Sequence, residues 1–191
     1  MVAIVKEYTV EDTVRQMLFA MGVDLEDENF KDTPKRVAKA FGEILKWQDD
    51  NDRKNFLLSI KDKSFPTSYG GIVAQKRIKA VSMCPHHMQP IHYEIDIGYV
   101  AEDRALGLSK ITRIAEALAA RMVLQETLTD DIADFFEKEI NTKGVIVIVR
   151  GKHGCMTNRG VKQEIVTTTS SVRGLFEDDA PLRQEFLTLN S

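Results

Sequence analysis

Residues 72 to 100 read IVAQKRIKAVSMCPHHMQPIHYEIDIGYV, a run in which two strand-like segments flank a short polar break. The second segment, residues 91 to 100, alternates apolar and polar side chains, which is typical of a β-strand with one buried face. The first segment, residues 72 to 82, is also strand-like, although its alternation is less regular. The proline-containing break between them predicts a turn. The sequence therefore predicts two neighbouring strands of an antiparallel sheet.

The predicted turn carries an unusual concentration of metal-binding side chains. The chain has two cysteines and four histidines, and Cys84, His86 and His87 place three of these six residues within four positions. Thiolate and imidazole are preferred ligands of zinc. Alone, this short motif also fits a buried thiol beside surface imidazoles.

A second cluster, His153 and Cys155 in GKHGCMTNRG, follows another predicted strand at residues 145 to 149. Together the two clusters hold both cysteines and three of the four histidines. A zinc site with three protein ligands and one open position is the catalytic pattern. Because five candidates exceed three ligands, histidines that do not bind the metal are available for proton transfer.

The remaining patterns predict helices at both ends and in the middle of the chain. Thr9 is a candidate N-cap of the first helix. The expected order is helices followed by β-β-α-α-β-β, which indicates an α+β fold with an antiparallel sheet. We expect a helical extension and connection over residues 1–70 and a catalytic domain over residues 71–191. The expected elements besides those named are helices over 9–21, from 33–34 onward, 109–125, 127–141 and 181–189, and a strand over 163–173.

Composition narrows the class of protein. The chain has 191 residues, 43% of them hydrophobic and 29% charged, with a net charge of −3. An acidic chain has no overall attraction for nucleic acid or anionic membranes. No apolar run approaches the roughly 18 residues that a membrane helix needs. We expect a cytoplasmic protein with free thiols or metal-bound cysteines.

A possible anion site lies at the start of a predicted helix, in GLSKITR over residues 107–113. Ser109 is placed to cap that helix, and Lys110 and Arg113 add positive charge where the helix dipole already favours anions. Arg159 adds a cation after the second cluster. The alternative interpretation is an ordinary capped helix with solvated cations.

Taken together, these motifs resemble the GTP cyclohydrolase I family, a family of zinc enzymes that begin pterin biosynthesis. The resemblance covers most of the chain and implies the tunnelling fold, in which β-β-α-α-β-β units form a barrel. It also implies a homo-oligomer, a decamer of two stacked pentamers, with GTP bound between subunits. The matching stretches, in order, are DTPKRVAKAF (32–41), CPHH (84–87), GLSKITRIAE (107–116), LQETLT (124–129), HGCMTNRG (153–160), GLF (174–176) and EFLTL (185–189).

The resemblance also implies a role for each matching residue. It assigns Cys84, His87 and Cys155 as zinc ligands. The residues that it assigns to catalysis are His86, His153 and Ser109. The residues that it assigns to substrate binding are Lys110, Arg113 and Arg159 for the ribose and triphosphate, and Gln125 and Glu126 for the guanine.

Two positions depart from the family's pattern. Pro85 stands where the family usually has glutamate, and Thr127 stands where it often has arginine. These changes leave two alternatives open: a zinc cyclohydrolase of the same fold with another purine substrate or product, or a non-catalytic ring that binds purines or pterins. A zinc-free reductase of the same fold is disfavoured by the paired clusters.

Overall fold

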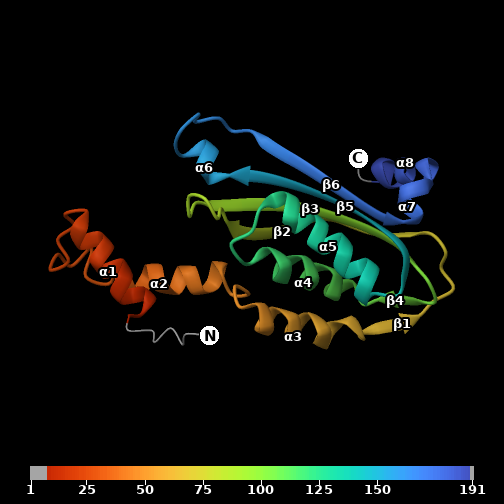
Figure 1. Ribbon diagram of the computed structural model, residues 1–191, viewed down its shortest axis with the longest axis horizontal. Helices are drawn as coiled ribbons and strands as arrows, with labels where there is room; N and C mark the ends of the chain where they lie inside the picture. Colours follow the sequence, from red (N-terminus) through yellow and green to blue (C-terminus); the bar gives the residue numbers. More distant parts are fainter. Residues whose placement is uncertain (1–7, 190–191) are drawn as a thin grey trace, which may run out of the picture. The chain divides into compact units, whose positions relative to one another are not determined.

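The computed structural model describes residues 8–189 (Figure 1). The chain forms two compact units, divided between Ile44 and Leu45. The domain boundary expected at residue 70 stays a prediction. The second unit already includes helix α3 (Asp50–Lys61), because its buried Leu57 and Ile60 belong to the core of that unit. Within residues 8–189, no helix is both long and apolar enough to cross a membrane.

The described part of the first unit holds helices α1 (Val10–Ala20) and α2 (Thr33–Ile44), as predicted. Thr9 caps α1: its side chain accepts a hydrogen bond from the backbone N–H of Asp12, whose carboxylate accepts one from the N–H of Thr9. This reciprocal capping box satisfies two N–H groups that a helix leaves free. Gly22 follows α1 with φ at +77°, a conformation that favours glycine.

The second unit is built on a four-stranded antiparallel sheet with the strand order β2-β3-β5-β6. A separate two-stranded ladder pairs β1 (Ser64–Pro66) with β4 (Arg104–Leu106). The predicted α+β class with an antiparallel sheet is confirmed. The four strands of the main sheet are β2 (Ile72–Met83), β3 (Pro90–Ala101), β5 (Thr142–His153) and β6 (Val166–Gly174).

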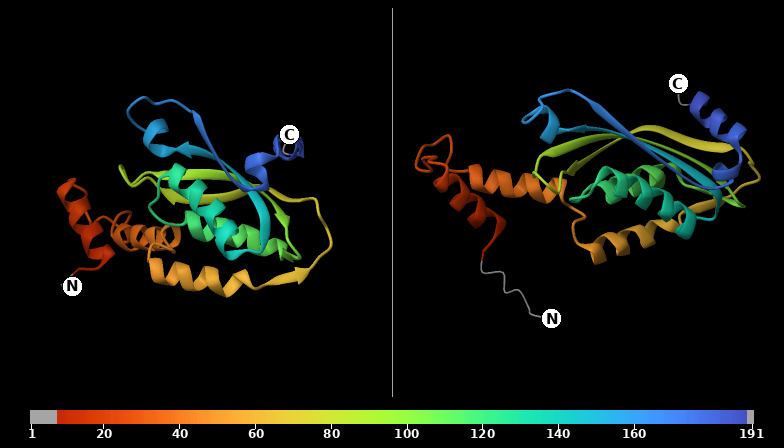
Figure 2. Two further views of the ribbon diagram at one scale, coloured as in Figure 1. Left: turned by 45° about the vertical axis from the view of Figure 1, so that its right-hand side comes forward. Right: turned by 45° about the horizontal axis from the view of Figure 1, so that its top comes forward.

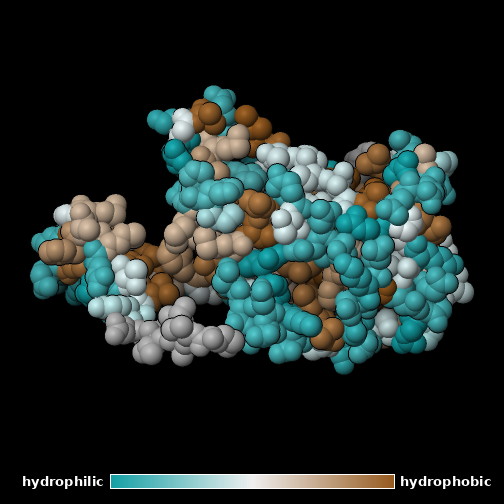
Figure 3. All heavy atoms as spheres, in the orientation of Figure 1, coloured by the Kyte–Doolittle hydropathy of each residue, from teal (hydrophilic) through white to brown (hydrophobic). Residues whose placement is uncertain are grey.

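Helices cover both faces of this sheet, because successive side chains along a strand point to opposite sides (Figures 1 and 2). On one face, α4 (Leu108–Ala119) and α5 (Gln125–Glu139) pack against residues such as Val147. On the other face, α7 (Leu175–Asp178) and α8 (Ala180–Leu189) pack against residues such as Ile146. Figure 3 shows a largely hydrophilic outer surface over α3 and α5.

The helix expected over residues 109–125 is shorter than predicted. It ends at Ala119, and the next helix begins at Gln125. In the segment between them, the carbonyl of Arg121 accepts a hydrogen bond from the Ser82 hydroxyl at 2.6 Å. This bond to a distant strand replaces a helical one, and a periodic sequence pattern gives no sign of it.

One end of the main sheet gathers both predicted clusters. β2 ends there and β3 begins there, with the first cluster in the turn between them. β5, expected over residues 145–149, continues to His153 because it pairs with a strand on each side. It leads into the short helix α6 (Gly154–Thr157), which carries Cys155. The N-terminus of α5 lies at the same end (Figure 1).

The packing of α8 on the sheet can be tested at Gly98 of β3. A Cβ atom at this position would lie 2.5 Å from the Phe186 ring and 3.2 Å from Ile146. We expect Gly98→Ala to lower the free energy of unfolding by about 1–3 kcal/mol through overpacking, measured by urea denaturation. The control is Gly42→Ala in α2, where an added Cβ meets no atom within 4 Å. Equal unfolding midpoints for wild type and Gly98→Ala would contradict the packing.

Candidate active site

The turn between β2 and β3 brings the first cluster together. The Cys84 backbone N–H donates to the Gln89 carbonyl at 2.8 Å, and the Cys84 carbonyl accepts from the Met88 N–H at 2.9 Å. These bonds fold the turn back on itself, so that the ligand atoms of Cys84, His86 and His87 all lie within 4.8 Å of one another. Cys84 is buried and both histidines are exposed, so the cluster is open on one side.

The second cluster adds Cys155 to the same place. Burial raises the pKa of the Cys155 thiol, and a hydrogen bond with Cys84 and repulsion from it raise the pKa further. The two thiols are therefore near neighbours. Gly154 permits this close approach, because a Cβ there would lie 2.7 Å from the Pro90 carbonyl oxygen. Both cysteines are free thiols.

The donor set fits a zinc ion. The Sγ atom of Cys84 lies 3.6 Å from Nδ1 of His87. A thiolate and an imidazole bound to one tetrahedral zinc, with bonds of about 2.3 and 2.0 Å, would be about 3.6 Å apart. Cys155 lies near Cys84, so this geometry allows Cys84, His87 and Cys155 to share a metal ion, and their assignment as zinc ligands stays a prediction. His86 lies close enough to be a ligand as well, so its assignment to catalysis stays a prediction.

His153 is held by Gln125, the first residue of α5. Nε2 of His153 lies 2.8 Å from Oε1 of Gln125. The Gln125 amide nitrogen donates to the carbonyls of Val149 and Thr167, each at 3.0 Å. Because that nitrogen already faces acceptors, the amide oxygen must face His153, whose Nε2 then carries the proton. Nδ1 of His153 is left to accept or give a proton.

Glu126 acts on the same region from the first turn of α5. Burial lowers the pKa of His153, and the Glu126 charge opposes this by raising it. Glu126 is exposed, whereas Gln125 is only 2% exposed and is engaged with His153 and the sheet. The predicted binding of guanine by both residues stays a prediction, and Glu126 is the more accessible of the two.

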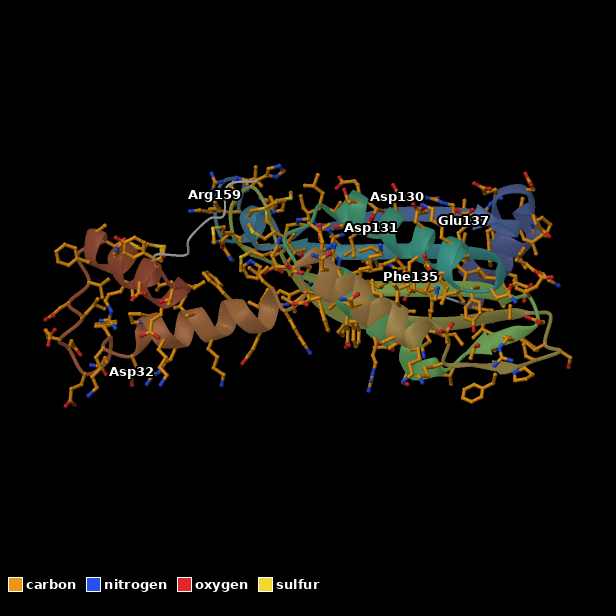
Figure 4. All side chains as sticks on the ribbon, turned by 60° about the horizontal axis from the view of Figure 1, so that its bottom comes forward. Asp32, Asp130, Asp131, Phe135, Glu137 and Arg159 are labelled. Atoms are coloured by element: carbon orange, nitrogen blue, oxygen red, sulfur yellow. The ribbon has the colours of Figure 1, made fainter. Side chains whose placement is uncertain are left out.

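Arg159 lies just beyond α6, at the cluster's end of the second unit (Figure 4). Its positive charge favours the thiolate form of Cys155 and so acts to lower the pKa of that thiol. Asp130, Asp131 and Glu137 are labelled on α5 in the same view.

The other predicted anion-binding residues lie at the opposite end of the sheet. The start of α4 is fixed to Gln75 near the beginning of β2, where the Gln75 amide donates to the Leu108 carbonyl at 2.9 Å. Cys84 follows the far end of that strand, on the order of 25 Å away. Within one chain, Ser109, Lys110 and Arg113 therefore do not meet the cluster. The capping role expected of Ser109 is wrong, since Gly107 is the N-cap of α4.

Tyr93 is a residue of the site that the sequence pattern does not reveal. It occupies an apolar position of the alternating strand β3, so the sequence pattern predicts a core residue. In the structure it is 2% exposed, and its ring lies edge-on to His153, with 6.3 Å between ring centroids. Burial raises the pKa of its hydroxyl, and repulsion from Glu126, Cys84 and Cys155 adds to this effect.

Comparison with known proteins gives the family of the chain. The family model described as GTP cyclohydrolase I matches residues 10–191. The chain belongs to the GTP cyclohydrolase I family. This is a family of enzymes, and the resemblance expected from the motifs is confirmed.

Relatives named GTP cyclohydrolase 1 match over nearly their whole length. The protein of Bacillus subtilis is 38% identical, covering 96% of this chain and 95% of the relative. That of Wolinella succinogenes is 36% identical over 95% and 96%. That of Mycolicibacterium paratuberculosis is 40% identical over 94% and 87%.

Solved structures with other names match about half of the chain. An archaeosine synthase QueF-like protein in the apo form matches with a TM-score of 0.43 and 18% identity, over 55% of this chain and 96% of that one. E. coli dihydroneopterin aldolase in complex with neopterin matches with a TM-score of 0.43 and 14% identity, over 54% and 98%. Membership of the GTP cyclohydrolase I family rests on the sequence matches.

The metal centre leads to a prediction about zinc content. We expect purified protein to hold about one zinc ion per chain and Cys155→Ala to lose it, because removal of one thiolate from a three-ligand site lowers the affinity steeply. Elemental analysis after gel filtration measures the content. The control is His92→Ala, an exposed histidine of β3 outside the cluster, which should keep the zinc. Equal zinc content in the Cys155→Ala variant and the wild type would contradict the site.

Proposed function

We propose that the protein is a zinc-dependent GTP cyclohydrolase I, which hydrolyses the purine C8 of GTP to give 7,8-dihydroneopterin triphosphate and formate. The observation that carries the proposal is the meeting of Cys84, Cys155 and His87 beside His153 and Glu126 at one end of the sheet. We also propose the cytoplasm as its compartment, since both thiols are free.

Cys84, His87 and Cys155 would hold the zinc ion. When bound, zinc supplies a Lewis acid that lowers the pKa of a coordinated water toward neutrality. The exposed side of the cluster, where His86 and His87 lie, leaves room for water and substrate. Cys84 is buried, and its backbone is hydrogen-bonded within the turn, so its thiol is positioned before a substrate binds.

His153 would protonate N7 of the purine through Nδ1, because Gln125 holds its Nε2 proton. Protonation at N7 makes C8 electrophilic, so that water adds there and the ring opens to a formamide. A second water releases formate. The ribose then opens, rearranges and recloses with loss of one water, so that one water is consumed overall. We assign His86 and Ser109 to proton transfers in these later steps.

Glu126 would bind the guanine. A carboxylate has two acceptor oxygens, and guanine presents its N1–H and its amino group as parallel donors. The exposed position of Glu126 in the first turn of α5 leaves it free to reach a ligand, and its charge already acts on His153. This pairing would place the purine between Glu126 and the metal.

Lys110 and Arg113 would bind the triphosphate together with Arg159, but only Arg159 lies near the cluster of its own chain. We therefore propose that a second copy brings the start of its α4 to this site. This supports a homo-oligomer with active sites between subunits, and the family resemblance suggests a decamer of two stacked pentamers.

Activity on GTP tests the proposal. We expect zinc-loaded protein to produce formate and the near-ultraviolet absorbance of the dihydropterin together. Glu126→Gln should lower kcat/KM by about 10- to 100-fold, because one charged hydrogen-bond acceptor is lost. The matched control is Glu137→Gln, farther along α5, which should keep wild-type activity.

Two results would contradict this function. Zinc-loaded wild type that forms neither formate nor pterin would exclude the cyclohydrolase reaction. Formate without the pterin chromophore would favour the alternative in which the reaction stops after ring opening, for which Pro85 is a reason.

Complementation tests the shared site. Arg113→Ala and Cys155→Ala should each be inactive alone, since each removes part of every site. When the two are co-expressed, some interfaces should combine an intact α4 start with an intact metal cluster, and about a quarter of the activity should return for random pairing at each interface. Formate release measures it. Mixed oligomers with no activity would contradict sites shared between chains.

A further inference from the structure

The Tyr93 hydroxyl is buried at the candidate active site without a hydrogen-bond partner. Its oxygen is the buried side-chain polar atom that finds no partner among residues 8–189. Tyr93 is only 2% exposed. A buried hydroxyl without a partner destabilises a fold, and native proteins nearly always satisfy such groups. An unpaired hydroxyl in this position therefore indicates a partner that arrives with a ligand.

A second tyrosine on the same strand shows what a purely structural position looks like. Tyr99 lies six residues along β3, packs in the same core and is fully buried. Its hydroxyl oxygen accepts a hydrogen bond from the backbone N–H of Leu106 at 2.8 Å. The contrast separates the two tyrosines: the fold satisfies Tyr99 but leaves Tyr93 unsatisfied.

The sheet makes room for Tyr93 at the site. Tyr93 lies opposite Gly151 in the β3–β5 register. A Cβ atom at Gly151 would lie 2.9 Å from the Tyr93 ring and 3.0 Å from Nε2 of His153. The absence of a side chain at Gly151 thus leaves room for the Tyr93 ring to pack edge-on against the His153 imidazole.

The surroundings of the hydroxyl identify its role. Glu126, Cys84 and Cys155 all lie close enough to act on it electrostatically, so the hydroxyl shares an end of the sheet with the carboxylate proposed to bind guanine and with the two thiols. A phenol is protonated at neutral pH, which makes its hydroxyl a hydrogen-bond donor. The acceptor it needs must come from the reacting end of the substrate.

We propose that Tyr93 donates a hydrogen bond to the oxygen atom that hydrolysis adds to C8 of the purine. The inference rests on the cyclohydrolase function proposed above. When the second water attacks the formamide carbon, negative charge grows on this oxygen. A fixed donor therefore stabilises that transition state more than it stabilises bound GTP. Tyr93 is accordingly a catalytic residue, with an effect on kcat rather than on KM.

Tyr93→Phe tests the proposal, with Tyr99→Phe as the matched control on the same strand. We expect Tyr93→Phe to lower kcat for formate release from GTP by about 100-fold, the scale for one lost oxyanion donor, with KM changed less than about twofold. Zinc content should equal that of the wild type. Tyr99→Phe should leave kcat close to the wild-type value.

Thermal unfolding without nucleotide gives a second readout that does not depend on activity. Tyr93→Phe removes an unpaired hydroxyl and should raise the melting temperature by a few degrees. Tyr99→Phe removes a satisfied hydroxyl and leaves the Leu106 N–H without an acceptor, so it should lower the melting temperature.

Each contrary result has a distinct meaning. An unchanged kcat in Tyr93→Phe overturns the proposal and leaves the cyclohydrolase function intact. A fall in kcat accompanied by loss of zinc or by a lower melting temperature also overturns it, because Tyr93 is then structural. A raised KM with unchanged kcat overturns it in favour of ground-state binding. Wild type without formate release would instead refute the underlying function.

Discussion

The antiparallel register between β3 and β5 is the constraint on which the site depends. It places Ile91 opposite His153 and Tyr93 opposite Gly151. Because side chains alternate between the faces of a sheet, a slip of one residue in β5 would turn His153 away from α5, and a slip in β3 would do the same to Tyr93. β5 is an interior strand, paired along its length with both neighbours. The reacting groups are thus held by backbone hydrogen bonds rather than by loops alone.

Small residues then allow the two clusters to approach each other. Gly154 lets α6 approach the turn after β2, and Gly151 admits the Tyr93 ring beside His153. Gln125 completes the arrangement from α5, because its amide links the imidazole to carbonyls of the neighbouring strands. Strand, helix and turn thus orient one imidazole and two thiols before any ligand binds, which is what preorganised catalysis requires.

Much of this arrangement is predictable from the sequence. Period-two alternation over residues 91–100 predicts β3, and the placement of both clusters after strands predicts that they meet. Other features depend on distant partners. The end of α4 is set where Ser82 bonds to Arg121, and the separation of Ser109 from the cluster depends on where α4 begins beside β2. The sequence pattern predicts that Tyr93 is a core residue, because the lack of a hydrogen-bond partner for its hydroxyl is visible only in the structure.

The most direct test of the central claim, that the two turns meet in one metal centre, is X-ray absorption at the zinc edge of the purified protein. The account predicts two sulfur ligands at about 2.3 Å and nitrogen or oxygen ligands at about 2.0–2.1 Å, with one sulfur lost in Cys155→Ser that has been reconstituted with excess zinc. A spectrum with one sulfur ligand in the wild type, or one unaltered in Cys155→Ser, would contradict the account, because Cys84 and Cys155 would then not share a metal.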